Sequence, residues 1–147
     1  MELKIEKASP HDLKDVYTLM CELEECELDY ESFAAIYRSM LEEPERYGLL
    51  AAKAEGKMIG FVDIRFERLL HHAAKVAEIL ELIVQPGYRS LGVGQVLFDH
   101  ACLMAKERGC VQIECSSSQR RHRAHAFYIR NGMANDHFGF SLPFEME

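Results

Sequence analysis

The stretch from Glu78 to Gly94 places the strongest constraint on the fold of this chain. It reads Glu-Ile-Leu-Glu-Leu-Ile-Val-Gln-Pro-Gly-Tyr-Arg-Ser-Leu-Gly-Val-Gly. An apolar run of this kind predicts a buried strand, the turn residues after it predict a loop, and the two glycines mark the start of a helix. A chain that contains such a unit is expected to fold around a central sheet.

The glycines at the start of this helix indicate a site for an anion. Gly92 and Gly94 allow the backbone to approach a ligand without obstruction by a Cβ atom. The N–H groups of residues 90 to 95 would point outward at the positive end of the helix, which suits a pyrophosphate. The alternative is a strand–helix turn in which the glycines serve only close packing. The motif is not a P-loop, because no Gly-Lys-Ser/Thr sequence follows it.

The remaining segments predict a mixed α/β domain. Ser9 is expected to cap a helix that begins at Pro10, and the acidic stretch from Glu22 to Asp29 is expected to be a loop. Strands are expected over residues 3–7, 47–54, 58–65, 75–84, 111–114 and 138–144, and further helices over 33–40, 92–108 and 124–130. No linker divides the chain, so we expect a single domain over residues 1–147.

The composition excludes several classes of protein. The chain has a formal net charge of −7, which argues against a protein that binds the nucleic-acid backbone. No apolar run approaches the roughly 20 residues of a membrane span, and the charged N-terminus does not resemble a signal peptide. The five cysteines include no Cys-x-x-Cys pair. They are therefore expected to be reduced thiols in a cytoplasmic protein.

Three motifs together resemble the GCN5-related N-acetyltransferase (GNAT) family. Residues 89–94 match its Arg/Gln-x-x-Gly-x-Gly/Ala signature, residues 82–86 match Leu-x-Val-x-Pro, and residues 124–132 match Ala-x-x-Phe-Tyr-x-x-x-Gly. The resemblance implies an acyl-CoA N-acyltransferase fold, with a mostly antiparallel central sheet flanked by helices, and acetyl-CoA as co-substrate. It implies that the cofactor is bound by Leu82, Ile83, Val84, Arg89, Ser90, Leu91, Gly92, Val93, Gly94 and Gln95.

Other local patterns resemble the aminoalkylphosphonate N-acetyltransferases within this family. They are Leu70-His71-His72, the pair Glu78 and Glu81, Arg121-His122, His137-Phe138, and Glu27-Leu28-Asp29-Tyr30. The resemblance implies acetylation of a small primary amine, with an aminoalkylphosphonate as the first candidate. The alternatives are another small amine, a protein amino group, or a CoA-binding module without catalysis. Relatives are often dimers, so a homodimer is also considered, with no nucleic-acid or membrane partner.

The implied reaction needs a base and an acid. An ammonium must lose a proton before it attacks a thioester, and the departing thiolate must gain one. Glu78 is the candidate base, because it lies in an apolar run and at the position that supplies the base in relatives; it could also be a surface carboxylate. Tyr128 matches the tyrosine of the family motif and is the candidate acid. Glu81 should face the opposite side of the strand from Glu78, unless a bulge intervenes.

The acceptor site is expected to combine carboxylates with cations. The candidate substrate-binding residues are Asp29, Tyr30, His72, Glu81, Arg121 and His122. The cluster of Arg120 to Arg123 could bind a phosphonate, although relatives commonly have Asn where Arg121 stands and charged runs are usually solvated. His71 and His72 are adjacent and would point to opposite faces of a strand, so no metal site is predicted.

Overall fold

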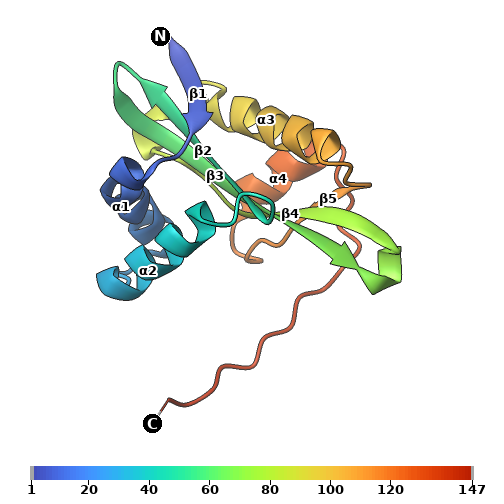
Figure 1. Ribbon diagram of the computed structural model, residues 1–147. Coiled ribbons are helices and arrows are strands. Elements are labelled where there is room, and N and C mark those ends of the chain that lie inside the picture. The colour runs from blue at the N-terminus through green and yellow to red at the C-terminus, as the bar shows by residue number, and fades with distance from the viewer. Residues whose placement is uncertain (1, 147) are drawn as a thin grey trace. The chain divides into compact units, whose positions relative to one another are not determined.

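The computed structural model describes residues 2–146, which form two compact units. The first unit runs to Glu114 and the second begins at Cys115. The first unit contains the sheet with a helical layer on each side (Figure 1). No helix among the described residues is long and apolar enough to cross a membrane.

The sheet has five strands, whose spatial order follows the order of the chain. They are β1 (Leu3–Lys7), β2 (Tyr47–Ala54), β3 (Lys57–Leu69), β4 (Ala74–Val84) and β5 (Ile113–Cys115). The pairs β1–β2, β2–β3 and β3–β4 are antiparallel. This arrangement confirms the predicted mixed α/β fold with a mostly antiparallel central sheet. The strand β3 extends four residues beyond its predicted end at Arg65.

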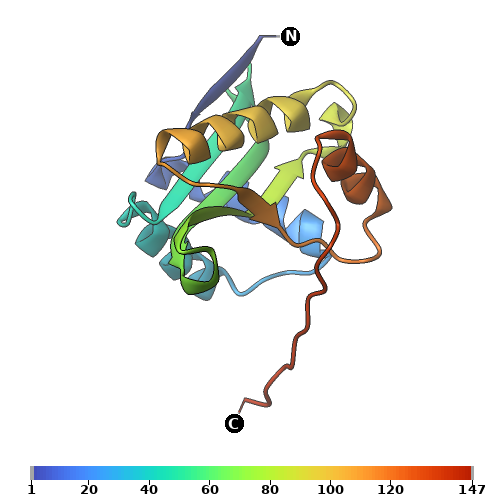
Figure 2. The same cartoon turned by 90° about the vertical axis from the view of Figure 1, so that its right-hand side faces the viewer.

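Helices cover both faces of the sheet in the first unit. They are α1 (Leu13–Glu24), α2 (Tyr30–Leu41) and α3 (Val93–Glu107), with short 3-10 turns at Pro10–Asp12, Leu70–His72 and Pro86–Tyr88. Figure 2 shows α3 in front of the sheet and the blue helices α1 and α2 behind it. As predicted, Ser9 caps the helix start: the His11 N–H donates to Ser9 Oγ, and the Ser9 N–H donates to Asp12 Oδ2 at 2.9 Å.

The pairing of β3 with β4 contains a bulge. Asp63 pairs with Glu81 and Ile64 pairs with Ile79, so Leu80 is an extra residue on β4. Paired residues of an antiparallel sheet lie on the same face, and alternate residues of β3 also share a face. Arg65 pairs with Glu78, and therefore Glu78 and Glu81 lie on the same face of the sheet. The sequence predicts that the two glutamates face opposite sides of the strand unless a bulge intervenes. The bulge is present, and the two side chains share a face.

The second unit contains α4 (His122–Arg130) and an extended tail. Residues 133–146 form no helix or strand, so the predicted strand over residues 138–144 is wrong. The alternating apolar side chains of the tail are exposed, for example Phe140 at 94%. Alternation alone does not make a strand, because a strand needs a neighbour to accept and donate its hydrogen bonds.

Candidate active site

A pocket of about 320 Å³ lies between the sheet and the helices α1 and α2. Its walls are mostly apolar: α1 contributes Val16 and Met20, α2 contributes Phe33 and Met40, and the floor includes Phe61 of β3. Small-molecule sites have this character, a largely apolar cavity with a few polar groups that orient the ligand. The described residues that line the pocket include no Lys, Arg or His.

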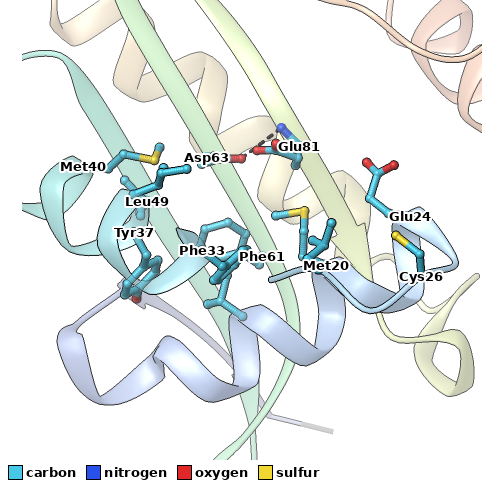
Figure 3. Close-up of a pocket in the computed structure, with 13 residues that line it drawn as sticks. Met20, Glu24, Cys26, Phe33, Tyr37, Met40, Leu49, Phe61, Asp63 and Glu81 are labelled. Carbon is cyan, nitrogen blue, oxygen red and sulfur yellow. Dashed lines mark hydrogen bonds between the residues drawn. The ribbon is translucent and has the colours of Figure 1, made fainter. Parts of the chain in front are cut away.

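Two carboxyl groups from neighbouring strands form the polar end of the pocket. Asp63 and Glu81 both line it, and the Glu81 N–H donates to Asp63 Oδ1 at 2.9 Å (Figure 3). Burial, and then the neighbouring Glu81 carboxyl group, raises the pKa of Asp63 well above its ordinary value. The raised pKa favours the protonated form of Asp63.

Glu78, the candidate base, lies on the same face as this pair but in a different setting. Its Oε1 accepts a hydrogen bond from Arg65 Nη2 in an ion pair between β3 and β4. Arg65 also lies 3.6 Å from Glu67. The structure therefore places Glu81 in the pocket wall and pairs Glu78 with a cation.

The backbone of β4 after the bulge presents a row of donors. The N–H groups of Glu81 and Gln85 donate toward β3, to Asp63 Oδ1 and to the Ile59 carbonyl. Successive N–H groups along a strand point to opposite edges, so the N–H groups of Leu82 and Val84 point away from β3. This is the direction required of backbone donors to an acyl-CoA molecule beside β4.

The loop after β4 leads this row of donors to the start of α3. Ser90 and Gly92 have positive φ values of 69° and 85°. Gly92 is the N-cap of α3, so the predicted helix start is confirmed to within one residue. The Arg89 Nε donates to the Val84 carbonyl at 3.3 Å and ties the loop to the strand. The N–H groups of Val93 and Gly94 lie in the first turn of α3, where backbone donors can serve an anion.

Three predicted site residues lie in the second unit. Arg121 is the N-cap residue of α4, His122 begins the helix, and Tyr128 lies in its second half. Burial, followed by the nearby Cys115 thiol, raises the pKa of Tyr128. The phenol is therefore protonated at neutral pH, and the raised pKa also makes it a weaker proton donor than an ordinary tyrosine.

The other predicted substrate residues have structural positions. Asp29 is the N-cap of α2, where its side chain accepts the Ser32 N–H at 2.9 Å. Tyr30 packs edge-on against Tyr17 with ring centres 5.1 Å apart. His72 lies in a 3-10 turn between β3 and β4, 3.6 Å from Glu114.

The two adjacent histidines also differ from the expectation that they point to opposite faces. The rings of His71 and His72 lie 4.4 Å apart, because the 3-10 turn does not follow the alternation of a strand. Among residues 2–146, no group of three or more His, Cys, Asp and Glu side chains could hold a metal ion.

Sequence reasoning missed Asp63. The sequence does contain an indication of this residue. The apolar run from Met58 to Ile64 predicts a buried strand, and Asp63 is the single carboxylate that interrupts it. Charged groups are rarely fully buried without a partner, so such a position indicates either a structural pair or a functional site.

Comparisons with known proteins concern the family and the fold of this chain. The profile described as "Acetyltransferase (GNAT) family" matches residues 12–133. The aminoalkylphosphonate N-acetyltransferase of Salmonella typhimurium is 34% identical over 138 residues, which cover 94% of this chain and 89% of that protein.

Two solved structures share the fold. One, described as a transcriptional regulator from Bacillus halodurans, is 21% identical with a TM-score of 0.88, and the match covers 97% of this chain and 100% of that one. The other is an aminoglycoside N-acetyltransferase in complex with CoA, 16% identical with a TM-score of 0.87; the match covers 99% of this chain and 96% of that one. From its profile match and its 34% identical relative, this chain belongs to the acetyltransferase (GNAT) family and is an N-acetyltransferase.

Proposed function

We propose that this protein transfers the acetyl group of acetyl-CoA to the primary amine of a small molecule by direct attack. The observation that carries the proposal is the continuity of β4, its loop and α3. The N–H groups of Leu82 and Val84 point away from β3, and the same backbone continues through Gly92 into the helix start. This single stretch would hold the acyl arm at one end and the pyrophosphate at the other.

The donors beside β4 would also assist the chemistry. A backbone N–H that points at the thioester carbonyl stabilises the negative charge that develops on its oxygen during attack. Leu82 follows Glu81, whose side chain lines the pocket. An amine in the pocket would therefore lie one residue away from the donor to the thioester.

For the acceptor, the first candidate is an aminoalkylphosphonate, and the relative from Salmonella supports it. The amine and its alkyl chain suit the apolar pocket, whose lining includes the carboxyl groups of Glu24, Asp63 and Glu81. The phosphonate would need cations, and Arg121 and His122 of the second unit are the candidates that the sequence offers. Tyr128 is the candidate acid for the departing sulfur.

The cofactor assignment is tested by adding a carboxylate at the helix start. Gly94→Asp should weaken acetyl-CoA binding by at least about tenfold, because the new negative charge faces the pyrophosphate. Gly87→Asp is the matched control: it adds the same charge in the preceding turn, where a Cβ atom meets nothing within 4 Å. Calorimetric titration with acetyl-CoA measures both. Equal affinities for the two variants would contradict the assignment.

Activity is tested with a panel of primary amines in an assay for released CoA thiol. The panel contains 2-aminoethylphosphonate, n-propylamine and a lysine-containing peptide. Turnover of the phosphonate above the other two supports the proposed acceptor. Turnover of the peptide alone would favour a protein amino group, and no turnover of any primary amine would contradict the proposed function.

A further inference from the structure

The pocket beside α1 and α2, with Asp63 and Glu81 at its polar end, indicates how the acceptor is bound. The pair stands at the end of an otherwise apolar cavity, and Asp63 is only 5% exposed. Two carboxyl groups so close together cannot both be ionised without a large electrostatic cost. The pair therefore favours a state with a proton on Asp63, whose pKa is raised by burial and by the neighbouring carboxyl group.

The charge of this pair selects the kind of ligand. A single negative charge in an apolar pocket is costly unless a cation meets it, and the residues that line the cavity provide none. A primary ammonium on a short apolar chain supplies both the cation and the surface that fits the walls. Ordinary ion pairs explain other carboxylates of this sheet: Glu78 bonds to Arg65, and Glu6 bonds to Lys53 at 2.9 Å.

We propose that the Asp63–Glu81 pair, rather than Glu78, binds the ammonium of the acceptor and takes its first proton. This inference rests on the proposed function. Glu81 is assigned as the catalytic residue, because it lines the pocket next to the donor Leu82. Asp63 is a positioning residue: it accepts the Glu81 N–H and shares the proton of the pair.

The protons balance in this scheme. The ammonium gives one proton to the negatively charged pair, and the freed lone pair forms the bond from nitrogen to the acetyl carbon. The bond from that carbon to sulfur breaks, and the sulfur leaves with its electron pair. The nitrogen loses a second proton, which the sulfur gains to give CoA thiol. The pair releases the first proton to solvent.

Several titratable and charged groups surround the pair and must be considered. Glu24 and Cys26 line the pocket at the end of α1, and Tyr37 lines it from α2. Arg65 and Glu78 follow on the same sheet face. The Tyr37 hydroxyl donates to the Ser9 carbonyl at 2.7 Å, and burial raises its pKa, so it does not serve as the base.

The proposal is tested with Glu81→Gln against Glu78→Gln. Glu81→Gln should lower kcat/KM for n-propylamine by about 10²–10⁴, the range for a lost general base, with acetyl-CoA affinity unchanged by calorimetry. The loss should shrink toward pH of about 10, where much of the amine is already neutral. Glu22→Gln, an exposed change on α1, is the matched control and should keep the wild-type rate. A loss in Glu78→Gln, with Glu81→Gln within threefold of the wild type, would overturn the proposal.

Asp63→Asn tests the role of the second carboxyl group through the pH profile. Removal of one acid from a coupled pair should move the acid limb of kcat/KM to higher pH, because the remaining carboxylate loses the protonated partner that stabilises its charge. Asp15→Asn, at an exposed position on α1, should leave the limb in place. An unmoved limb in Asp63→Asn would contradict the shared proton. If Asp63→Asn does not fold, the Glu81→Gln result decides.

A binding measurement separates this inference from the proposed function. In protein labelled with ¹³C at the carboxyl groups of Asp and Glu, n-propylamine should shift the signals of Asp63 and Glu81 without any turnover. If the wild type releases no CoA but these signals shift, the amine site stands and the proposed reaction fails. If it releases CoA and neither signal responds to the amine, the reaction stands and this site is wrong.

Discussion

The two faces of the sheet are packed in different ways. On the side of α3 there is little room: a Cβ atom on Gly60 would lie 3.0 Å from Leu97 Cδ1 and 3.1 Å from the Ile83 carbonyl oxygen. Leu97 is fully buried. On the side of α1 and α2 the helices leave a pocket of about 320 Å³. Both faces of the sheet are therefore covered by buried side chains, and the face under α1 and α2 combines its core with a cavity.

The largest expected effect is the loss of a core side chain on the α3 side. Leu97→Ala should lower the free energy of unfolding by about 2–5 kcal/mol, because it leaves a cavity in a closely packed layer. Met40→Ala, on the wall of the pocket, should cost only about 1 kcal/mol, because it widens a cavity that already exists. Urea unfolding measures both. Equal losses would show that the two faces contribute alike.

A smaller loss is expected when a methyl group is added on the same side. Gly60→Ala should cost about 1–3 kcal/mol, since Leu97 and Val93 must move and the Ile83 carbonyl belongs to the backbone. Gly87→Ala is the control, because its Cβ atom meets nothing within 4 Å. A neutral result for Gly60→Ala in thermal unfolding would mean that the α3 side has spare room after all.

The smallest effect is expected on the pocket side, and it depends on pH. The raised pKa of Asp63 means that the folded protein keeps a proton that the unfolded chain loses above pH of about 4. Its contribution to stability is therefore present at low pH and is lost as pH rises toward the folded pKa. Asp63→Asn keeps the size of the side chain and an acceptor for the Glu81 N–H, but it removes the titrating group. The free energy of unfolding of this variant, relative to the wild type, should therefore increase from pH 4 to pH 8.

Asp12→Asn provides a control of opposite sign. Although burial favours its neutral form, the hydrogen bonds from Lys53 and Ser9 hold the pKa of Asp12 below its ordinary value. Lys53 Nζ lies 2.8 Å from Asp12 Oδ1. This stability is present above the unfolded pKa and is lost as pH falls through the folded pKa. Asp12→Asn should therefore be less stable than the wild type at neutral pH. Urea unfolding over a series of pH values measures both variants. If the free energies of unfolding of Asp63→Asn and Asp12→Asn, relative to the wild type, changed with pH in the same direction, the opposite pKa shifts would be contradicted.

Local signals in the sequence predicted most of the fold. The cap at Ser9 and the helix start at Gly92 depend on interactions within a few residues, and both are confirmed. The tail was predicted wrongly because alternation between Phe138 and Phe144 says nothing about the presence of a neighbouring strand. Periodicity describes a segment, whereas a strand is a property of a pair.

The candidate site could be predicted only in part. The backbone stretch from Leu82 to Gln95 is continuous in the chain, so its motif identifies it directly. The pair Asp63 and Glu81 is brought together by the register of β3 and β4, and the bulge at Leu80 fixes that register. The spacing of residues within one strand does not predict which residues of the neighbouring strand they will pair with.

The extra residue at Leu80 also determines the curvature of the strand. Over the same span of pairs β4 is one residue longer than β3, so it must bend and twist more strongly to keep both ends aligned. A shorter strand without Leu80 could still place Glu78 opposite Arg65 and Glu81 opposite Asp63. It would lose the local bend and the stronger twist that a bulge gives to a strand. Pairing and curvature are therefore specified separately in β4, the first by side chains and the second by the number of residues.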